Sequence, residues 1–147
     1  MEKKRILVID DDEVVRNNLK AILELEGYNV DTAVTGKEAV DKSNASFYNL
    51  ALIDIRLPDM EGTQLLIAMH DTVPKMVKII VTAYPSQENA VEAVNMGADG
   101  YVVKPIMDTD EFLKKIKEHL KKQEEAQRYN EHKMVEYIET RARQEET

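Results

Sequence analysis

The fold of this chain is set by the stretch RILVIDDD at residues 5–12, in which a short apolar run ends in three acids. Three similar runs follow, LALID at residues 50–54, KIIVT at 78–82 and YVVKP at 101–105. Each run is rich in Val, Ile or Leu and then changes abruptly to a polar side chain. Apolar runs of this length, separated by helical stretches, are typical of parallel strands that are buried on both faces of a sheet.

Strand and helix patterns alternate along the whole first part of the chain. Strands are predicted at about 5–9, 28–33, 50–53, 78–81 and 100–103. Helices are predicted from about 14 to the stop at Gly27, from Thr35 to about Asn44, through Leu65 and Met69, from about Ser86 to Met96, and from Asp108 or Thr109 onward. This alternation implies right-handed crossovers, so the fold class is α/β with a doubly wound, five-stranded parallel sheet.

The composition changes near residue 121. Residues 121–147 hold six basic and seven acidic residues, with neither glycine nor proline. We therefore expect a domain at 1–121 and a charged helical extension or linker at 122–147 that continues the last helix. Met134, Val135 and Ile138 give this extension a short apolar patch suited to a partner helix, and the alternative is a solvated charged tail.

Composition and charge narrow the class of protein. The chain has 147 residues, is 43% hydrophobic and carries a formal net charge of −8. This apolar fraction is enough for one hydrophobic core. The negative charge argues against direct binding of nucleic acid, because the phosphate backbone is bound by clustered Lys and Arg. The absence of cysteine fits a reducing compartment, and no apolar run approaches the roughly 18 residues of a membrane span. We therefore expect a cytoplasmic protein without a membrane segment.

The polar residues that end the strands predict one site. Ligands of open parallel sheets bind at the carboxyl ends of the strands, so Asp10, Asp11, Asp54, Thr82 and Lys104 should meet at one edge. Clustered carboxylates repel one another, and a protein keeps such a cluster mainly to bind a cation. Oxygen ligands without His or Cys suit Mg²⁺, whereas the ammonium and the hydroxyl suit a phosphoryl group.

Asp54 is the expected nucleophile, because a carboxylate at the mouth of a strand can attack phosphorus. Each residue has a plainer explanation when it is taken alone. Asp54 would be a turn former, Lys104 an exposed surface charge and Thr82 a β-branched strand residue. Their joint placement at one sheet edge favours the phosphoryl site.

Four motifs, in this order and at this spacing, resemble the receiver (CheY-like) domain of two-component response regulators. They are ILVIDDDE at 6–13, DIRLPDMEG at 54–62, VTA at 81–83 and GADGYVVKP at 97–105. The resemblance covers roughly residues 4–121. It implies a flavodoxin-like (βα)5 fold with strand order 2-1-3-4-5 and a role in phosphorelay signal transduction.

The resemblance also implies roles for the acids. Asp54 matches the phosphoacceptor, which takes a phosphoryl group from the phosphohistidine of a histidine kinase. Asp11 matches the direct Mg²⁺ ligand, together with Asp54 and the backbone carbonyl of Arg56, and Asp10 matches an acid that reaches the metal through water. Arg56 and Tyr84 fall on variable positions that tune dephosphorylation in the family.

The remaining matches describe a switch. Lys104 matches the lysine that pairs with the phosphoryl group. Thr82 matches a hydroxyl that moves onto a phosphoryl oxygen, and Tyr101 matches an aromatic side chain that swings into the vacated space. The implied output is the face formed by the fourth helix, the fifth strand and the fifth helix. Asp12 stands where the family often has Glu, and we interpret it as a loop residue or helix cap.

The implied partners follow from the family. A sensor histidine kinase or a phosphotransfer protein would supply the phosphoryl group, and the domain would perform self-phosphorylation and self-dephosphorylation only, not the turnover of an enzyme. A homodimer or a downstream domain would contact the output face and the C-terminal helix. The chain would be either a stand-alone receiver or part of a longer signalling protein.

A second interpretation is a haloacid-dehalogenase-like phosphatase. The pattern Asp10-x-Asp12-x-Val14 fits that family, with Asp10 as the nucleophile and Thr82 and Lys104 in its second and third roles. Against it, no acidic pair follows Lys104 at a strand end, and no segment is long enough for a cap domain. A third interpretation, a non-phosphorylated interaction module on the same fold, is disfavoured because every residue of the predicted site is present.

Overall fold

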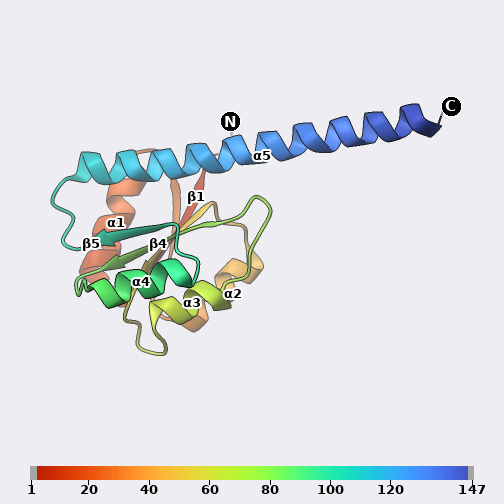
Figure 1. Ribbon diagram of the computed structural model, residues 1–147. Helices are drawn as coiled ribbons and strands as arrows, with labels where there is room; N and C mark the ends of the chain where they lie inside the picture. Colours follow the sequence, from red (N-terminus) through yellow and green to blue (C-terminus); the bar gives the residue numbers. More distant parts are fainter. Residues whose placement is uncertain (1–2, 146–147) are drawn as a thin grey trace.

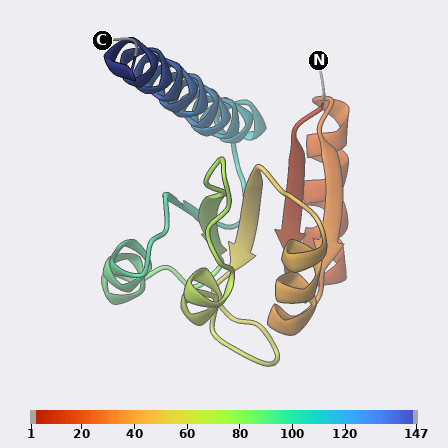
Figure 2. The same ribbon diagram turned by 90° about the vertical axis from the view of Figure 1, so that its right-hand side faces the viewer.

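The computed structural model describes residues 3–145, so Met1, Glu2, Glu146 and Thr147 lie outside the described part. Five parallel strands form one sheet in the order β2-β1-β3-β4-β5, and helices cover both of its faces (Figures 1 and 2). The elements are β1 (Arg5–Ile9), α1 (Glu13–Leu25), β2 (Asn29–Ala33), α2 (Gly36–Ala45), β3 (Leu50–Asp54), α3 (Gly62–Ala68), β4 (Val77–Thr82), α4 (Gln87–Asn95), β5 (Gly100–Val103) and α5 (Thr109–Glu145). The predicted fold class, strand order and extended C-terminal helix are confirmed, and the predicted strand bounds differ from these by one residue at most.

The burial of each strand follows its place in the sheet. β3 and β4 are buried over their whole lengths and β1 from Ile6 onward, whereas the edge strands β2 and β5 are partly exposed. Ile6 and Val8 face a cluster covered by α1 and α5, and Leu7 and Ile9 face a second cluster covered by α2, α3 and α4. Each such side chain contributes about 1.5–3 kcal/mol by leaving water, so the carboxyl ends of the central strands are held firmly.

The helix starts are capped by side chains close to the site. The carboxylate of Asp12 accepts a hydrogen bond of 2.9 Å from the Val14 N–H, so Asp12 is a helix cap, one of the two roles expected for it. Thr35 caps α2 by accepting from the Glu38 N–H at 3.1 Å. Thr35 and Glu38 have the spacing of a capping box, but the Glu38 carboxylate accepts from the Val34 N–H and not from the N–H of Thr35 itself.

Lys78 is a charged residue inside the fully buried strand β4. Its ammonium donates to the carbonyl oxygens of Leu66 at 2.9 Å and Met69 at 2.6 Å, and lies 3.7 Å from the Asp71 carboxylate. Burial lowers the pKa of Lys78. The side chain therefore joins the end of α3 to the middle of the sheet, by satisfying carbonyl groups that the helix itself leaves free.

Helix α5 begins on the domain and ends far from it (Figure 1). Its first part packs on the sheet through Phe112, Ile116 and Leu120. The last residue of α5 that is buried against the domain is Gln123, whose amide donates to the carbonyl oxygens of Asn49 at 2.9 Å and Lys75 at 2.7 Å. Because the Asn49 side chain also donates to Gln123 at 3.2 Å, the direction in which α5 leaves the domain is fixed by three hydrogen bonds.

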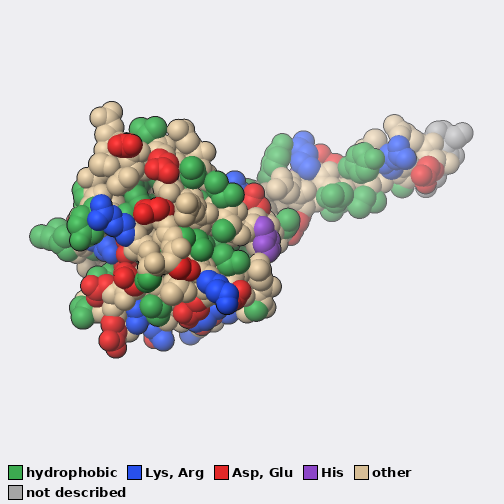
Figure 3. Space-filling view, turned by 90° about the horizontal axis from the view of Figure 1, so that it is seen from below, with side chains coloured by type: hydrophobic (Ala, Val, Ile, Leu, Met, Phe, Trp, Pro, Cys, Tyr) green, Lys and Arg blue, Asp and Glu red, His purple; other side chains and the backbone are tan. Residues whose placement is uncertain are grey.

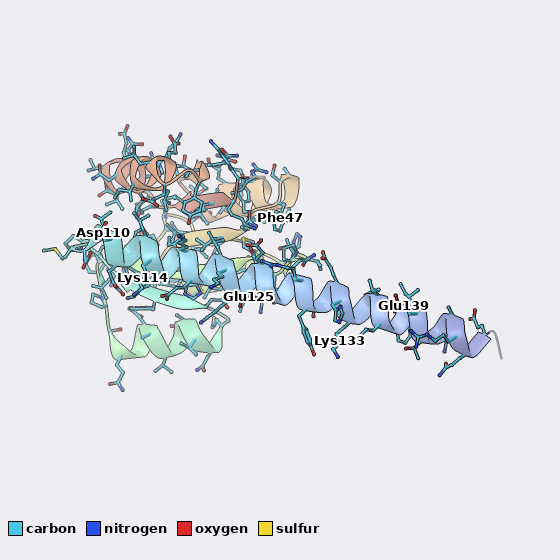
Figure 4. The ribbon with its side chains drawn as sticks, turned by 90° about the horizontal axis from the view of Figure 1, so that it is seen from above. Phe47, Asp110, Lys114, Glu125, Lys133 and Glu139 are labelled. Atoms are coloured by element: carbon cyan, nitrogen blue, oxygen red, sulfur yellow. The ribbon has the colours of Figure 1, made fainter. Side chains whose placement is uncertain are left out.

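The rest of α5, from residue 128 to 145, is exposed on every side. Lys133 and Glu139, for example, project from this part of the helix away from the domain (Figure 4). Hydrophobic side chains gather along this part in the view from below (Figure 3), and the large ones that are exposed are Tyr129, Met134, Val135, Tyr137 and Ile138. Within residues 3–145, no helix combines the length and the apolar character that crossing a membrane requires.

Candidate functional site

The register of β1 and β3 brings three acids together. Ile9 pairs with Ile53, so Asp10 and Asp54, the next residue of each chain segment, lie side by side at the carboxyl edge. Asp10 and Asp54 are buried and Asp11 is exposed. One carboxylate oxygen from each of these three residues lies within 4.8 Å of the others, which is the spacing of ligands around one metal ion.

The register of β4 and β5 adds the lysine. Thr82 pairs with Val103, and the N–H of Lys104 donates to the Thr82 carbonyl oxygen at 2.7 Å. The Lys104 ammonium then reaches back across the sheet edge, to 2.7 Å from Asp10 Oδ2 and 3.7 Å from Asp54 Oδ1. Four strands of the sheet thus supply the residues that sequence reasoning placed in one site.

Asp10 is held by more than the lysine. Its Oδ1 accepts a hydrogen bond of 2.9 Å from the Asp12 N–H, and its main-chain carbonyl accepts one of 2.9 Å from Arg16 Nη1. Arg16 stands on the first turns of α1 and was not among the residues predicted for the site. No motif marks it, because its contact depends on where α1 lies over the end of β1.

The charges of the site do not balance. Three carboxylates face one lysine ammonium, which leaves a formal charge of −2 at the edge of a buried sheet. Burial and the charge of Asp10 raise the pKa of Asp54 to about 6, although Lys104 acts in the opposite direction. A divalent cation that prefers oxygen ligands fits both this charge and this donor set.

The site opens into a cleft of about 670 Å³ that lies between α1 and the loops after β3, β4 and β5. Its walls include Ala83, Tyr84 and Ile106 as well as the acids. The guanidinium of Arg56 lies 4.3 Å from the centre of the Tyr84 ring, a cation–π contact at the mouth of the cleft. The Arg56 N–H lies 3.4 Å from Asp54 Oδ1, so the backbone of Arg56 adjoins the Asp54 carboxylate.

The two residues predicted for the switch lie behind the site. Thr82 is fully buried, and its hydroxyl oxygen accepts a hydrogen bond of 2.9 Å from the Tyr84 N–H. Tyr101 pairs with Ile80, two positions before the edge that carries Thr82. The Tyr101 ring is partly buried against the cluster under α2, α3 and α4, and its hydroxyl is buried without a hydrogen-bond partner among residues 3–145.

Comparison with known proteins gives the same family in sequence and in structure. A family model described as the response regulator receiver domain matches residues 6–117. An uncharacterized transcriptional regulatory protein, YkoG of Bacillus subtilis, is 34% identical over 121 residues, which make up 82% of this chain. The chain spans about half of that relative, 53% of its length.

Two crystal structures illustrate the structural likeness. A CheY-like response regulator receiver domain protein from Methanospirillum hungatei has a TM-score of 0.80 and 50% identity, over 85% of this chain and 99% of that one. A response regulator protein from Burkholderia pseudomallei has a TM-score of 0.70 and 34% identity, over 76% of this chain and 65% of that one. The second structure contains a phosphorylated aspartic acid, a calcium ion and citrate.

We expect Asp54→Asn to raise the free energy of unfolding near pH 7, without divalent ions, by on the order of 2 kcal/mol. The pKa of Asp54 in the folded protein lies above its ordinary value of 3.8, so ionisation is harder in the folded state than in the unfolded state. The resulting cost is absent below pH 3.8, grows as the pH rises, and is complete above about pH 6. Urea unfolding near pH 4 and near pH 7 measures it.

The matched control is Asp41→Asn, because Asp41 is an exposed acid on α2 outside the cluster. Mg²⁺ should remove the advantage of Asp54→Asn, since the ion compensates the carboxylates of the wild-type protein. Equal stability of the wild type and Asp54→Asn near pH 7 without metal, or an equal gain at both pH values, would contradict the expectation.

Proposed function

Because the chain belongs to the response regulator receiver domain family, we propose that Asp54 is its phosphoacceptor. Receiver domains are signalling domains of two-component response regulators, and the proposed donor here is the phosphohistidine of a sensor histidine kinase or of a phosphotransfer protein. The observation that supports the proposal is the group formed by Asp10, Asp11 and Asp54, with the Lys104 ammonium 2.7 Å from Asp10 and 3.7 Å from Asp54. The chemistry acts on the domain's own side chain, so we propose no separate substrate that is turned over.

The proposed metal is Mg²⁺, which Asp11, Asp54 and the backbone carbonyl of Arg56 would bind directly and Asp10 through water. When bound, it neutralises the carboxylates and the phosphoryl oxygens, so that an anionic donor can approach an acidic site. An oxygen of Asp54 forms the bond to phosphorus as the phosphorus–nitrogen bond of the donor breaks, and the imidazole leaves with the electron pair. Lys104, which already lies close to Asp54, binds a phosphoryl oxygen by charge.

The phosphatase interpretation, with Asp10 as the nucleophile, is not supported. The chain belongs to another family, and Asp10 is ion-paired with Lys104 while it also accepts the Asp12 N–H. The second acid of the phosphatase pattern, Asp12, uses its carboxylate to cap α1. One oxygen of the Asp12 carboxylate therefore serves to hold the start of α1, which is a structural role.

We expect Asp54→Asn to abolish the uptake of a phosphoryl group from acetyl phosphate in the presence of Mg²⁺, because the nucleophile is removed. Asp11→Asn should reduce the uptake about tenfold or more, since it removes a ligand of the metal. Intact-protein mass spectrometry counts the added phosphoryl groups, with Asp41→Asn as the control. Full labelling of Asp54→Asn, combined with loss of labelling in Asp10→Asn, would instead favour the phosphatase.

Thr82 and Tyr101 are proposed to carry the switch. Phosphorylation replaces the single charge of the Asp54 carboxylate with an acyl phosphate that carries about −1.5 to −2 charge and three phosphoryl oxygens as acceptors. A Thr82 hydroxyl that turns toward one of these oxygens gives up its bond with the Tyr84 N–H, which releases the loop after β4. The Tyr101 hydroxyl has no partner in its buried position among residues 3–145, and this cost would be relieved in an outward position where water solvates the hydroxyl. The proposed output is the face formed by α4, β5 and α5.

Thr82→Ala should still bind beryllofluoride at Asp54 yet lose the amide chemical-shift changes on α4, β5 and α5, because it lacks the hydroxyl that senses the added oxygens. Thr82→Ser keeps that hydroxyl and should keep most of the changes. Two-dimensional NMR of the three proteins with and without beryllofluoride measures the response. Wild-type shift changes in Thr82→Ala would refute the proposed role.

Residues 122–147 are proposed to be a helical connector that follows the receiver domain at 1–121. An isolated helix of fewer than about 15 residues is marginal in water, and the exposed part of α5 is only slightly longer. A partner helix would stabilise it, and in the isolated chain a second copy supplies an identical patch at Met134, Val135 and Ile138. In a longer protein, a downstream domain would take the same place.

We expect Ile138→Glu to shift the isolated chain from dimer to monomer, because a carboxylate cannot be buried between two helices without a partner. The control is Glu139→Gln, which changes charge on the exposed part of the same helix. Multi-angle light scattering at several concentrations gives the mass, and circular dichroism gives the helix content. A wild-type chain that is monomeric at every concentration would refute pairing through this patch.

A further inference from the structure

The loop between β3 and α3, residues 55–61, contacts the first turn of α2 (Figure 2). The Asp59 carboxylate accepts hydrogen bonds from the Gly36 N–H at 2.8 Å and from the Lys37 N–H at 2.9 Å. Neither N–H has an acceptor inside the helix, because the first N–H groups of an α-helix point past its end. The Thr35 hydroxyl accepts a hydrogen bond from the Glu38 N–H. Asp59 therefore completes the cap of α2, which begins 23 residues earlier in the chain.

Met60, the residue after Asp59, packs on the same first turn of α2. A Cβ atom added to Gly36 would lie 2.5 Å from the Sδ atom of Met60, so the Met60 side chain covers that glycine directly. Two consecutive loop residues therefore contact one helical turn, one by charge-assisted hydrogen bonds and one by packing. The tip of the loop is held from the side of α2.

The base of the same loop is held against the strand that carries the nucleophile. A Cβ atom on Gly62 would clash with the carbonyl oxygen of Asp54, and the Gly62 N–H donates to the Ile55 carbonyl at 2.8 Å. Within the loop, the Leu57 N–H donates to the Met60 carbonyl at 3.1 Å. Arg56 and Leu57 lie between the base of the loop, at Ile55 and Gly62, and its tip, at Asp59 and Met60. The position of their backbone therefore depends on what holds both parts.

Few other contacts hold the backbone of Arg56. Its side chain is exposed and lies over the Tyr84 ring, and its backbone forms an isolated antiparallel bridge with Glu61 across the loop. Its N–H lies 3.4 Å from the Asp54 carboxylate, which is long for a hydrogen bond. The position of the Arg56 carbonyl is therefore set by the conformation of the whole loop. The tip of that loop is in turn held by the hydrogen bonds of Asp59 to α2.

We propose that Asp59 is a positioning residue for the metal site, which holds the β3–α3 loop, and with it the Arg56 carbonyl, through its contact with α2. The proposal rests on the proposed function, in which that carbonyl is a ligand of Mg²⁺. Residues that orient metal ligands without touching the metal commonly change affinity by about tenfold to a hundredfold when they are substituted. A residue that only capped α2 would change the stability of that helix and leave the affinity for Mg²⁺ alone.

The test compares Asp59→Ala with Thr35→Ala in the full chain. Both substitutions remove an acceptor from the first turn of α2, but Thr35 contacts the helix and Asp59 joins the helix to the loop. Isothermal titration calorimetry with MgCl₂ should give about tenfold weaker binding for Asp59→Ala and wild-type binding for Thr35→Ala. Asp59→Asn keeps one acceptor oxygen and should fall between the wild type and Asp59→Ala.

A second measurement needs no metal. Hydrogen exchange of the Leu57 and Gly62 amides should be faster in Asp59→Ala than in the wild type, and unchanged in Thr35→Ala. If Asp59→Ala does not fold, Asp59→Asn is compared with Thr35→Ala in both measurements. Equal effects of the two substitutions on affinity and on exchange, or no effect of either, would overturn the inference.

Asp11→Asn separates this inference from the proposed function. If the wild type binds Mg²⁺ and Asp11→Asn does not, the proposed metal site is supported. The positioning role of Asp59 is then tested only by the comparison of Asp59→Ala with Thr35→Ala. If the wild type binds no Mg²⁺, or if Asp11→Asn binds it as tightly as the wild type does, the proposed metal site and the role of Asp59 are both refuted.

Discussion

The ammonium of Lys104 is the single positive charge placed against the carboxylates of Asp10 and Asp54 in the described structure, and the site depends on this incomplete neutralisation. With Asp11 included, the carboxylates outnumber the ammonium. Burial, together with the charge of Asp10, raises the pKa of Asp54 to about 6. A bound cation would complete the balance of charge, and a phosphoryl group on Asp54 would change it again. Both proposed events would therefore act on the same electrostatic interaction, which would join metal binding to phosphoryl transfer.

The sheet keeps these charges together although they repel. β3 and β4 are buried along their whole lengths, so a shift of one strand would expose several apolar side chains to water. The loops around the site are less constrained. Asp59 holds the loop between β3 and α3 against the start of α2, and the Thr82 hydroxyl at the end of β4 accepts a hydrogen bond from Tyr84 in the following loop. A rigid base with separately held loops would allow Asp54, the proposed nucleophile, to stay in place while the surrounding backbone responds.

Much of this arrangement could be predicted from the sequence, because it depends on local patterns. The apolar runs gave the strands, and each polar residue at the end of a run marked the edge where Asp10, Asp54 and Lys104 meet. The contacts that could not be predicted join residues far apart in the chain without any pattern. Asp59 caps α2 across 23 residues, and Gln123 bonds Asn49 across 74.

The measurement that tests this account most directly is the titration of the Asp54 carboxyl carbon by ¹³C NMR in the metal-free protein. Burial of Asp54 beside Asp10, with incomplete neutralisation by Lys104, predicts a pKa of about 6, which Mg²⁺ should lower because the ion favours the charged form. A pKa of about 4 in the metal-free protein, the ordinary range for an aspartate, would contradict the account, because Lys104 would then neutralise the effects of burial and of Asp10 completely.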